Sequence, residues 1–350
     1  MSTIEGSATA GRVRRISPVR VFLNRPEFGS IVGAILIWLV FAFLAGSNGF
    51  LSWRGAAGYL EIASQIGIIG SMVALLMIAG EFDLSVGSMV GATGIILGLS
   101  LDVWGLPIWL AVVVAFAFAL AVGALNGYLV VRTGLPSFLV TLGSLFILRG
   151  ASIGATRLIT GRTVVGSLDQ YTAGDPISEL FTATLFTIDG GEFPVSILWW
   201  LGVSLVATFV LLRTRFGNWI FGVGGSRNAA RNVGVPVARV KVILFMCTAG
   251  AAALLATIQV LGVGSADVLR GQGKEFEAII TAVIGGTLLT GGYGSALGTM
   301  FGAFTLGVTQ LGIIFAGINT DWYQVVLGGM LLSAVLVNDY IRRRSSEARR

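Results

Sequence analysis

The sequence predicts an all-α, polytopic membrane protein with about ten transmembrane helices and both termini in the cytoplasm. Composition is the first indication, because 55% of the 350 residues are hydrophobic and 11% are charged, whereas soluble domains carry about 25% charged residues. The second indication is that apolar runs of about 17–25 residues, long enough to cross a bilayer, recur along the chain. The third is that Lys and Arg gather at the ends of these runs, a pattern that orients membrane proteins.

Ten predicted spans follow one another along the chain, with the longest connections at 156–193 and 213–241. They are expected at 28–45, 59–79, 84–101, 107–131, 136–155, 194–212, 242–263, 278–290, 296–315 and 322–340. Arg149-Gly150 interrupts the fifth span, and glycines interrupt the short eighth span. The segment 156–193 is too polar to span and is expected on the outer side. Residues 28–341 then form one transmembrane domain between a basic leader, 1–27, and a cytoplasmic tail, 342–350.

The distribution of positive charge decides the predicted orientation. Of the 23 Lys and Arg residues, 17 fall on the inner side, in the leader, at Arg132, in the polar island 213–241 and in the tail. The other six, expected outside or at a span end, are Arg54, Arg149, Arg157, Arg162, Arg270 and Lys274. The net charge of +6 therefore reflects membrane topology and does not indicate nucleic-acid binding.

Missing residue types exclude several kinds of chemistry. The 350 residues include no histidine and a single cysteine, Cys247, which excludes His-based general bases, HExxH zinc sites and an intrachain disulfide. Gly222–Arg227 lacks the Gly-Lys-Ser/Thr ending of a phosphate-binding loop. We therefore expect no catalytic residue, metal site or nucleotide site on this chain.

The polar island 213–241 holds six basic residues and no acidic residue. Within it, Ser226 is suited to an N-cap, residues 228–233 to a helix body, Gly234 to its end and Pro236 to a stop. A short basic helix between two spans needs a partner on its own side of the membrane. Since the chain has no nucleotide site, we expect this helix to hand a mechanical load to an ATPase on the inner face; a loop that only sets topology is the alternative.

Polar residues also interrupt the apolar runs near the third and fifth spans. Asp83 is expected to cap the third span, with Ser85 and Glu81 favoured at its positive end; a cation site or proton relay is the alternative. Pro136 suits the first turn of the fifth span, on which Thr141 and Ser144 share one side.

Gln259, Gln310 and Gln324 are the other polar side chains expected at membrane depth. Such groups either bond to neighbouring helices or line a path for a neutral polar solute. No Asp, Glu or Lys is expected at mid-bilayer, which argues against an ion-coupled secondary transporter.

Glycine spacing and internal similarity suggest how the helices are arranged. Four pairs predict close helix packing: Gly29/Gly33, Gly94/Gly98, Gly123/Gly127 and Gly298/Gly302. Residues 81–93 resemble 275–287, and 142–145 resemble 327–330. Because the first pair would start on opposite sides of the membrane, the halves are predicted to be inverted pseudo-repeats.

Three blocks, in order along the chain, resemble a known family. They are Glu81-Phe-Asp-Leu-Ser-Val-Gly-Ser88, then Asn126-Gly127 with Gly134-Leu-Pro-Ser-Phe-Leu-Val-Thr-Leu-Gly143 and Arg149-Gly150, then Gly224-Gly-Ser-Arg-Asn-Ala-Ala230 with Gly234-Val235. Together they resemble the permease subunits of ribose-, xylose-, arabinose- and galactose-type ABC importers, over about residues 28–340. Glu81 stands where the family usually has an apolar residue, Ser226 where Asn is frequent, and Asn232 where Ser is common.

The resemblance implies a type II ABC importer-like fold in the bacterial inner membrane and a homodimer of permeases. It also implies an ABC ATPase, which carries ATP and Mg²⁺, on the inner side, and a periplasmic sugar-binding protein outside. The solute would be a monosaccharide or related polyol; a stand-alone secondary transporter or channel for a small neutral solute is the alternative.

The resemblance assigns roles to particular residues. Residues 226–235 would be the coupling helix, and the coupling residues are Gly224, Gly225, Ser226, Arg227, Asn228, Ala229, Ala230, Val233, Gly234 and Val235. Passage is implied between the fifth and tenth spans, which makes Thr141, Ser144 and Gln324 candidates for the translocation path. Gln259 and Gln310, polar side chains expected at membrane depth, are further candidates. Arg157, Arg162, Arg270 and Lys274 are expected to meet acidic residues of the binding protein. The structural signature residues are Asp83, Ser85, Asn126 and Pro136.

Overall fold

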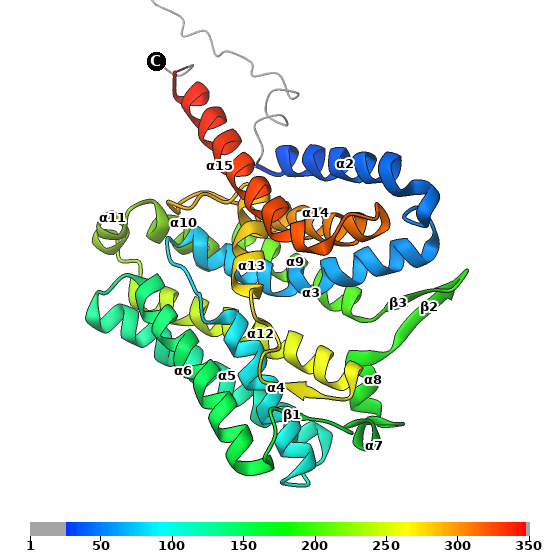
Figure 1. Cartoon of the computed structure of the whole chain (residues 1–350). Coiled ribbons are helices and arrows are strands. Elements are labelled where there is room, and N and C mark those ends of the chain that lie inside the picture. Colours follow the sequence, from blue (N-terminus) through cyan, green and yellow to red (C-terminus); the bar gives the residue numbers. More distant parts are fainter. Residues whose placement is uncertain (1–25, 348–350) are drawn as a thin grey trace, which may run out of the picture.

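The computed structural model of the chain describes residues 26–347 (Figure 1). The predicted leader, 1–27, therefore lies outside the described residues except for its last two positions. Arg349 and Arg350 of the predicted tail also lie outside them.

The described chain is mainly helical and contains eight helices that are long and apolar enough to cross a membrane. These are α2 (Pro26–Ala45), α3 (Trp53–Ile78), α5 (Ile108–Thr133), α6 (Ser137–Thr160), α9 (Ser196–Arg213), α12 (Val237–Val263), α14 (Ala296–Phe315) and α15 (Tyr323–Glu347). A polytopic helical membrane protein is thus confirmed. Arg149-Gly150 does not interrupt the fifth span as predicted, because α6 continues through both residues to Thr160.

The other two predicted spans are shorter than expected. α4 (Val86–Asp102) has 17 residues and α13 (Lys274–Ile284) has 11; a helix of 11 residues rises about 16 Å, half the thickness of a bilayer core. The short eighth span was expected at 278–290, but α13 begins at Lys274, Gly285 ends it and Gly286 has a φ of +87°. Each short helix follows a stretch that is not helical. Residues 79–85 precede α4, and residues 264–273, which include the two-residue strand β4, precede α13.

This geometry also separates the two stretches that resemble each other. Glu81 and Asp83 precede α4, whereas Glu275 and Glu277 lie within the first turn of α13. The compared residues therefore do not occupy matching positions, and the inverted-repeat arrangement stays a prediction.

Short elements cover the two ends of the helical bundle (Figure 1). One end, called the α11 end here, carries α10 (Arg215–Gly225) and α11 (Arg227–Asn232). The opposite end, called the ribbon end, carries the antiparallel pair β2 (Thr184–Ile188) and β3 (Gly191–Pro194). The remaining short elements are η1 (Gly46–Asn48), β1 (Val164–Val165), α7 (Asp169–Thr172), α8 (Pro176–Thr182), β4 (Ala266–Asp267) and η2 (Thr320–Trp322).

α3 and α12 form the centre of the molecule and are the most deeply buried of the candidate spans. Three of the four glycine pairs pack helices closely: a Cβ on Gly123 would lie 2.6 Å from the carbonyl oxygen of Phe245, and one on Gly302 would lie 2.2 Å from that of Thr281. In the third pair, Gly94 meets Cγ2 of Val260 on α12 at 3.0 Å, while Gly98 packs against Ala266 of β4 at 2.9 Å. Gly29 and Gly33 have no such neighbour within 4 Å, so they do not pack helices within the described chain.

Candidate functional site

The predicted short helix of the polar island is present as α11 (Arg227–Asn232). Ser226 is its N-cap, and the Ser226 hydroxyl accepts from the Ala229 amide at 3.4 Å. Gly234 follows the helix with a φ of +84°, a conformation that favours glycine. The predicted cap, body and end of this helix are therefore confirmed.

α11 presents most of its predicted coupling residues at the α11 end of the molecule. Gly225, Ser226, Arg227, Asn228, Ala229 and Gly234 are exposed, and Gly224 and Val235 are half-buried. Val233 is 79% exposed, a high fraction for an apolar side chain. Such exposure leaves Val233 in a position to contact a partner. Ala230 is the exception, because it is 5% exposed and faces Gly222 of α10, so it supports the helix from within.

The residues on either side of α11 are anchored to residues 78–85, which run from the end of α3 to the start of α4. On the N-terminal side, a Cβ on Gly224 would lie 1.8 Å from the Ile78 carbonyl oxygen. On the C-terminal side, Lys241 in the second turn of α12 forms a buried ion pair with Glu81. Lys241 is only 3% exposed, so it is not one of the free cytoplasmic charges counted in the sequence.

The four structural signature residues gather around the start of α4. The Ser85 hydroxyl donates to Asp83 Oδ1 at 2.6 Å and accepts from Asn126 Nδ2 of α5 at 3.1 Å. Asp83 Oδ2 accepts from the Thr248 hydroxyl of α12 at 2.6 Å. Thr248 lies about 16 Å along α12 from its start, so this cluster lies deep within the bundle. The N-cap of α4 is Ser85 and not Asp83; the Asp83 carboxylate holds the backbone turn and α12.

Pro136 contributes by starting α6 beside the same residues. It is the N-cap residue of α6, and the next residue, Ser137, accepts from the Phe82 amide at 2.9 Å. One turn further, the Thr141 hydroxyl accepts from the Leu84 amide at 3.0 Å. Thr141 is 0% exposed. It therefore supports residues 82–84 and does not line a path in this arrangement.

The other path candidates lie in different environments. Ser144 is half-buried on α6, and Gln324 is exposed on α15. Gln259 donates to Gln65 Oε1 of α3 at 2.8 Å, so it bridges two helices. Gln310 has a buried carbonyl oxygen without a hydrogen-bond partner. Ser144, Gln310 and Gln324 remain path candidates.

A charged pair lies where none was expected. Arg149 lies about 18 Å from the start of α6, and its Nη2 is 3.8 Å from Glu275 Oε1 at the start of α13. Glu275 is 3% exposed. No Asp, Glu or Lys was expected at mid-bilayer, yet Glu275 lies beside the middle of α6, so that expectation no longer argues against secondary transport. Arg149-Gly150 looked like a span end in the sequence, which concealed this pair.

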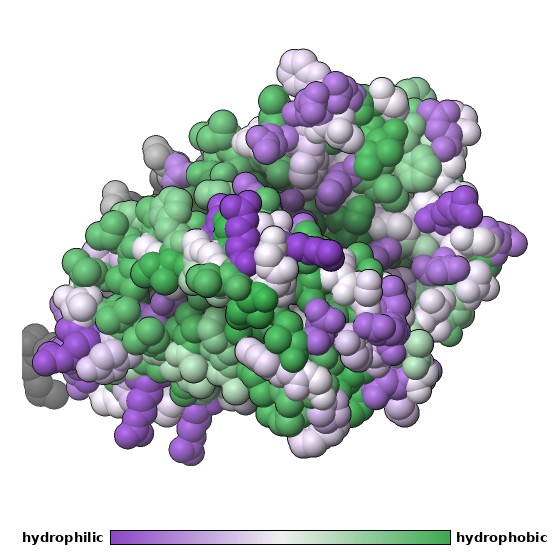
Figure 2. Space-filling view, turned by 60° about the horizontal axis from the view of Figure 1, so that its bottom comes forward, coloured by the Kyte–Doolittle hydropathy of each residue, from purple (hydrophilic) through white to green (hydrophobic). Residues whose placement is uncertain are grey.

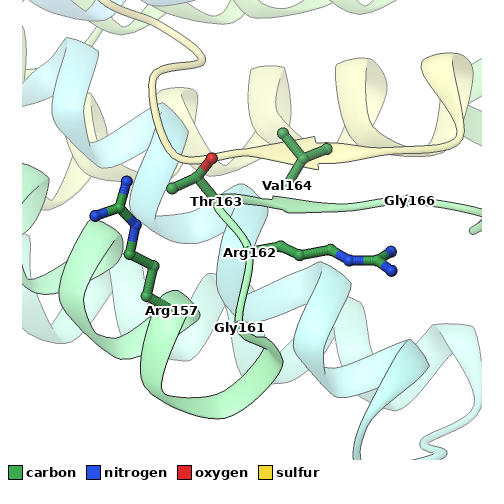
Figure 3. A pocket seen from close by; sticks show the side chains of 6 residues that line it. All are labelled: Arg157, Gly161, Arg162, Thr163, Val164 and Gly166. Atoms are coloured by element: carbon green, nitrogen blue, oxygen red, sulfur yellow. The ribbon is translucent and has the colours of Figure 1, made fainter.

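The proposed docking residues separate into two groups. Arg157 and Arg162 are exposed and line a pocket of ≈ 480 Å³ together with Gly161, Thr163, Val164 and Gly166 (Figure 3). Their side chains extend in different directions from the end of α6 and the loop that follows it (Figure 3). Arg270 instead donates to the Gln259 carbonyl at 3.0 Å, and Lys274 pairs with Glu277 at 2.6 Å. Arg157 and Arg162 are thus the two docking candidates that remain free to meet a partner.

Sequence reasoning missed α10 and the partners of Glu81 and Glu275. The apolar positions Ile220 and Val223, buried on one side of α10, were the available signal for that helix. No local pattern signalled the ion pairs, because their members are 160 and 126 residues apart.

Comparison with known proteins identifies the family to which the chain is similar. The family described as branched-chain amino acid transport system/permease component matches residues 55–335. The ribose import permease protein RbsC of Escherichia coli (strain K12) is 30% identical over 321 residues, which cover 89% of this chain and 94% of RbsC. The inner membrane ABC transporter permease protein YjfF of the same strain is 32% identical over 285 residues, covering 81% and 83%.

The xylose transport system permease protein XylH of the same organism is 29% identical over 371 aligned positions, covering 92% of this chain and 94% of XylH. No solved structure matches the chain at a significant level. The family match and the relatives confirm the resemblance seen in the sequence blocks, and with the candidate spans they assign the chain to the inner membrane as a non-catalytic transport component. The chain belongs to the family of inner-membrane permease components of ABC transporters for sugars.

Proposed function

We propose that this permease moves a monosaccharide or related polyol across the inner membrane, after delivery by a periplasmic binding protein. The energy comes from ATP hydrolysis in a separate ABC ATPase subunit. The relatives support the solute class, since two of them are permeases for ribose and xylose. ATP and Mg²⁺ belong to the partner, and the permease itself contributes no cofactor.

The exposed coupling helix carries this proposal. α11 lies at one end of the bundle (Figure 1). It carries Arg227 and Arg231, and its residue Ala229 and the adjoining Val233 are exposed. A small, capped helix with a basic surface and an exposed apolar side chain suits insertion into a cleft of a soluble partner. In this proposal the α11 end faces the cytoplasm and the ribbon end faces the periplasm.

We also propose that two copies of the chain form the path, with α6 and α15 near the shared interface. Both helices leave most of their surface uncovered in the single chain. Polar residues on these helices, Ser144 and Gln324, would then face the path instead of lipid. Figure 2 shows the α6 side of the molecule, where hydrophilic side chains gather around a hollow within a largely apolar surface.

Reconstitution tests this function. The chain, its ABC ATPase and its binding protein are placed in proteoliposomes with internal ATP, and uptake of labelled ribose and xylose is measured. We expect uptake only when all three components and ATP are present. Solute flux through the chain alone, without ATPase or binding protein, would instead support a stand-alone transporter or channel.

A further inference from the structure

We propose that residues 78–85, called the link segment here, transmit movement of the coupling helix to α6. They are positioning residues for transport, since they act through other parts of the chain. The inference rests on the proposed function, because it needs α11 to be driven by an ATPase. Three sets of contacts carry it: one on each side of α11 and one with α6.

The first contact precedes α11 in the chain. At the end of α10, the backbone of Gly224 packs so closely on the end of α3 that an added Cβ would lie 1.8 Å from the Ile78 carbonyl oxygen. The Gly292 amide of the α13–α14 loop donates to that same oxygen at 2.8 Å. A Cβ on Gly291 would lie 2.8 Å from the Cα of Gly80. Three backbone segments therefore meet at the beginning of the link segment with no side chain between them.

The second contact follows α11. Pro236 leads directly into α12, and Lys241 in the second turn of α12 pairs with Glu81. The Lys241 and Glu81 side chains are 4% and 11% exposed, so water does not screen the pair strongly. Both chain segments that hold α11 are thus connected to one stretch of eight residues, and α11 cannot shift as a unit without loading it.

The third set of contacts leads from the link segment to α6. The Phe82 and Leu84 amides donate to the hydroxyls of Ser137 and Thr141, at 2.9 and 3.0 Å. These residues are not helical, so their backbone amides depend on α6 side chains for partners. Displacement of the link segment therefore moves the first two turns of α6 or breaks these bonds. α6 is one of the two helices proposed to line the path.

Removing the Thr141 hydroxyl tests the last step. In the complete importer, with ATPase and binding protein, Thr141→Val leaves the Leu84 amide without its acceptor. We expect the variant to assemble with the ATPase and hydrolyse ATP, while solute taken up per ATP hydrolysed falls about tenfold, the order of effect of one lost buried acceptor. Thr141→Ser, which keeps the hydroxyl, should restore the ratio.

α6 itself offers a matched control. Thr156 is also 0% exposed, but its hydroxyl donates only to the Ser152 carbonyl of the same helix, at 2.6 Å. Thr156→Val should leave the uptake-to-ATP ratio unchanged. Should Thr141→Val fail to assemble, Ser137→Ala is measured instead, since it removes only the acceptor of the Phe82 amide.

The beginning of the link segment has its own pair of variants. Gly224→Ala forces a Cβ against Ile78, whereas Gly202→Ala on α9 meets nothing within 4 Å and lies outside the coupling residues. We expect Gly224→Ala alone to lower the uptake-to-ATP ratio while ATPase binding persists.

Two negative results have different meanings. An equal ratio in Thr141→Val, Ser137→Ala, Gly224→Ala and their controls would overturn the link-segment proposal while leaving ATP-driven import intact. Absence of ATP-dependent uptake by the wild-type assembly would refute the proposed function itself.

Discussion

The structural role of Glu81 depends on a residue that is distant in the sequence. In the sequence it stands where the family usually has an apolar residue, and its one local explanation is the positive end of the third span. The structure pairs it with Lys241, which is 160 residues away, and buries both side chains. Two buried charges that neutralise each other are tolerated, whereas one left alone is costly. The two residues therefore depend on each other.

Breaking this pair should destabilise the protein. Glu81→Gln and Lys241→Met each leave one buried charge without its partner, and we expect the free energy of unfolding to fall by about 3–5 kcal/mol. Thermal unfolding of the detergent-purified protein measures the change. The double variant Glu81→Leu/Lys241→Leu should recover most of the loss.

An exposed carboxylate provides the comparison. Glu192 on β3 is exposed, so Glu192→Gln should stay within about 0.5 kcal/mol of wild type. An equally small effect of Glu81→Gln would contradict the burial argument.

The two neighbouring alanines of α11 should behave differently. Ala229 is exposed and Ala230 is 5% exposed, so Ala229→Glu should weaken ATPase binding about tenfold or more without changing thermal stability. Ala230→Glu should lower both. Pull-down by the ATPase and melting temperature separate the two effects, and normal binding by both Ala229→Glu and Val233→Glu would remove α11 as the docking element.

At the level of elements, a helix was predictable where the residues that signal it lie close together in the sequence. α11 was predicted correctly because its cap, body, Gly234 and Pro236 lie within 11 residues. The eighth span was predicted wrongly because its apolar run, 278–290, includes the glycines that end α13, while the start of α13 at Lys274 is polar. Thr141 was placed on the path by its helix face, and only the folded position of Leu84 shows that its hydroxyl is occupied.

The packing of α5 on α12 depends on glycine. A Cβ at Gly123 would lie 2.6 Å from the Phe245 carbonyl oxygen, so Gly123→Ala must push the helices apart. We expect a loss of about 1–3 kcal/mol in stability, measured by thermal unfolding. Gly33→Ala is the control, because nothing lies within 4 Å of its added Cβ and alanine favours a helix. Equal stability of the two variants would show that α5 and α12 do not pack this closely.

The proposed function gives the whole molecule two functionally different ends. α11 and its flanking contacts lie at one end, while Arg157 and Arg162 belong to the end of α6 and the loop beyond it. The sequence predicted this division from the distribution of charge along the chain. It could not predict that Arg270 and Lys274 are engaged within the protein, because that depends on how the stretch 264–273 folds back along α4.

The exposed arginines should control the salt dependence of transport. Arg157→Glu and Arg162→Glu are expected to lower stimulation by the binding protein at low salt, with a smaller defect at about 1 M salt, where the Debye length is about 3 Å. ATPase stimulation in proteoliposomes at varied binding-protein concentration measures this. Arg132 is exposed at the end of α5, so Arg132→Glu is the matched control. An equal defect in Arg132→Glu would refute docking at Arg157 and Arg162.

The contacts of residues 78–85 also set an order for biogenesis. When the ribosome has made α3 and α4, the partners of Phe82 and Leu84 on α6 and the partner of Glu81 on α12 have not yet emerged. Residues 78–85, between α3 and α4, therefore reach their buried position only after α12 has been synthesised, more than 150 residues later. Until then it must stay hydrated or shielded by the insertion machinery, because unpaired amides and a lone carboxylate are excluded from lipid. Synthesis proceeds from one end of the chain, but completion of its first half waits for the second.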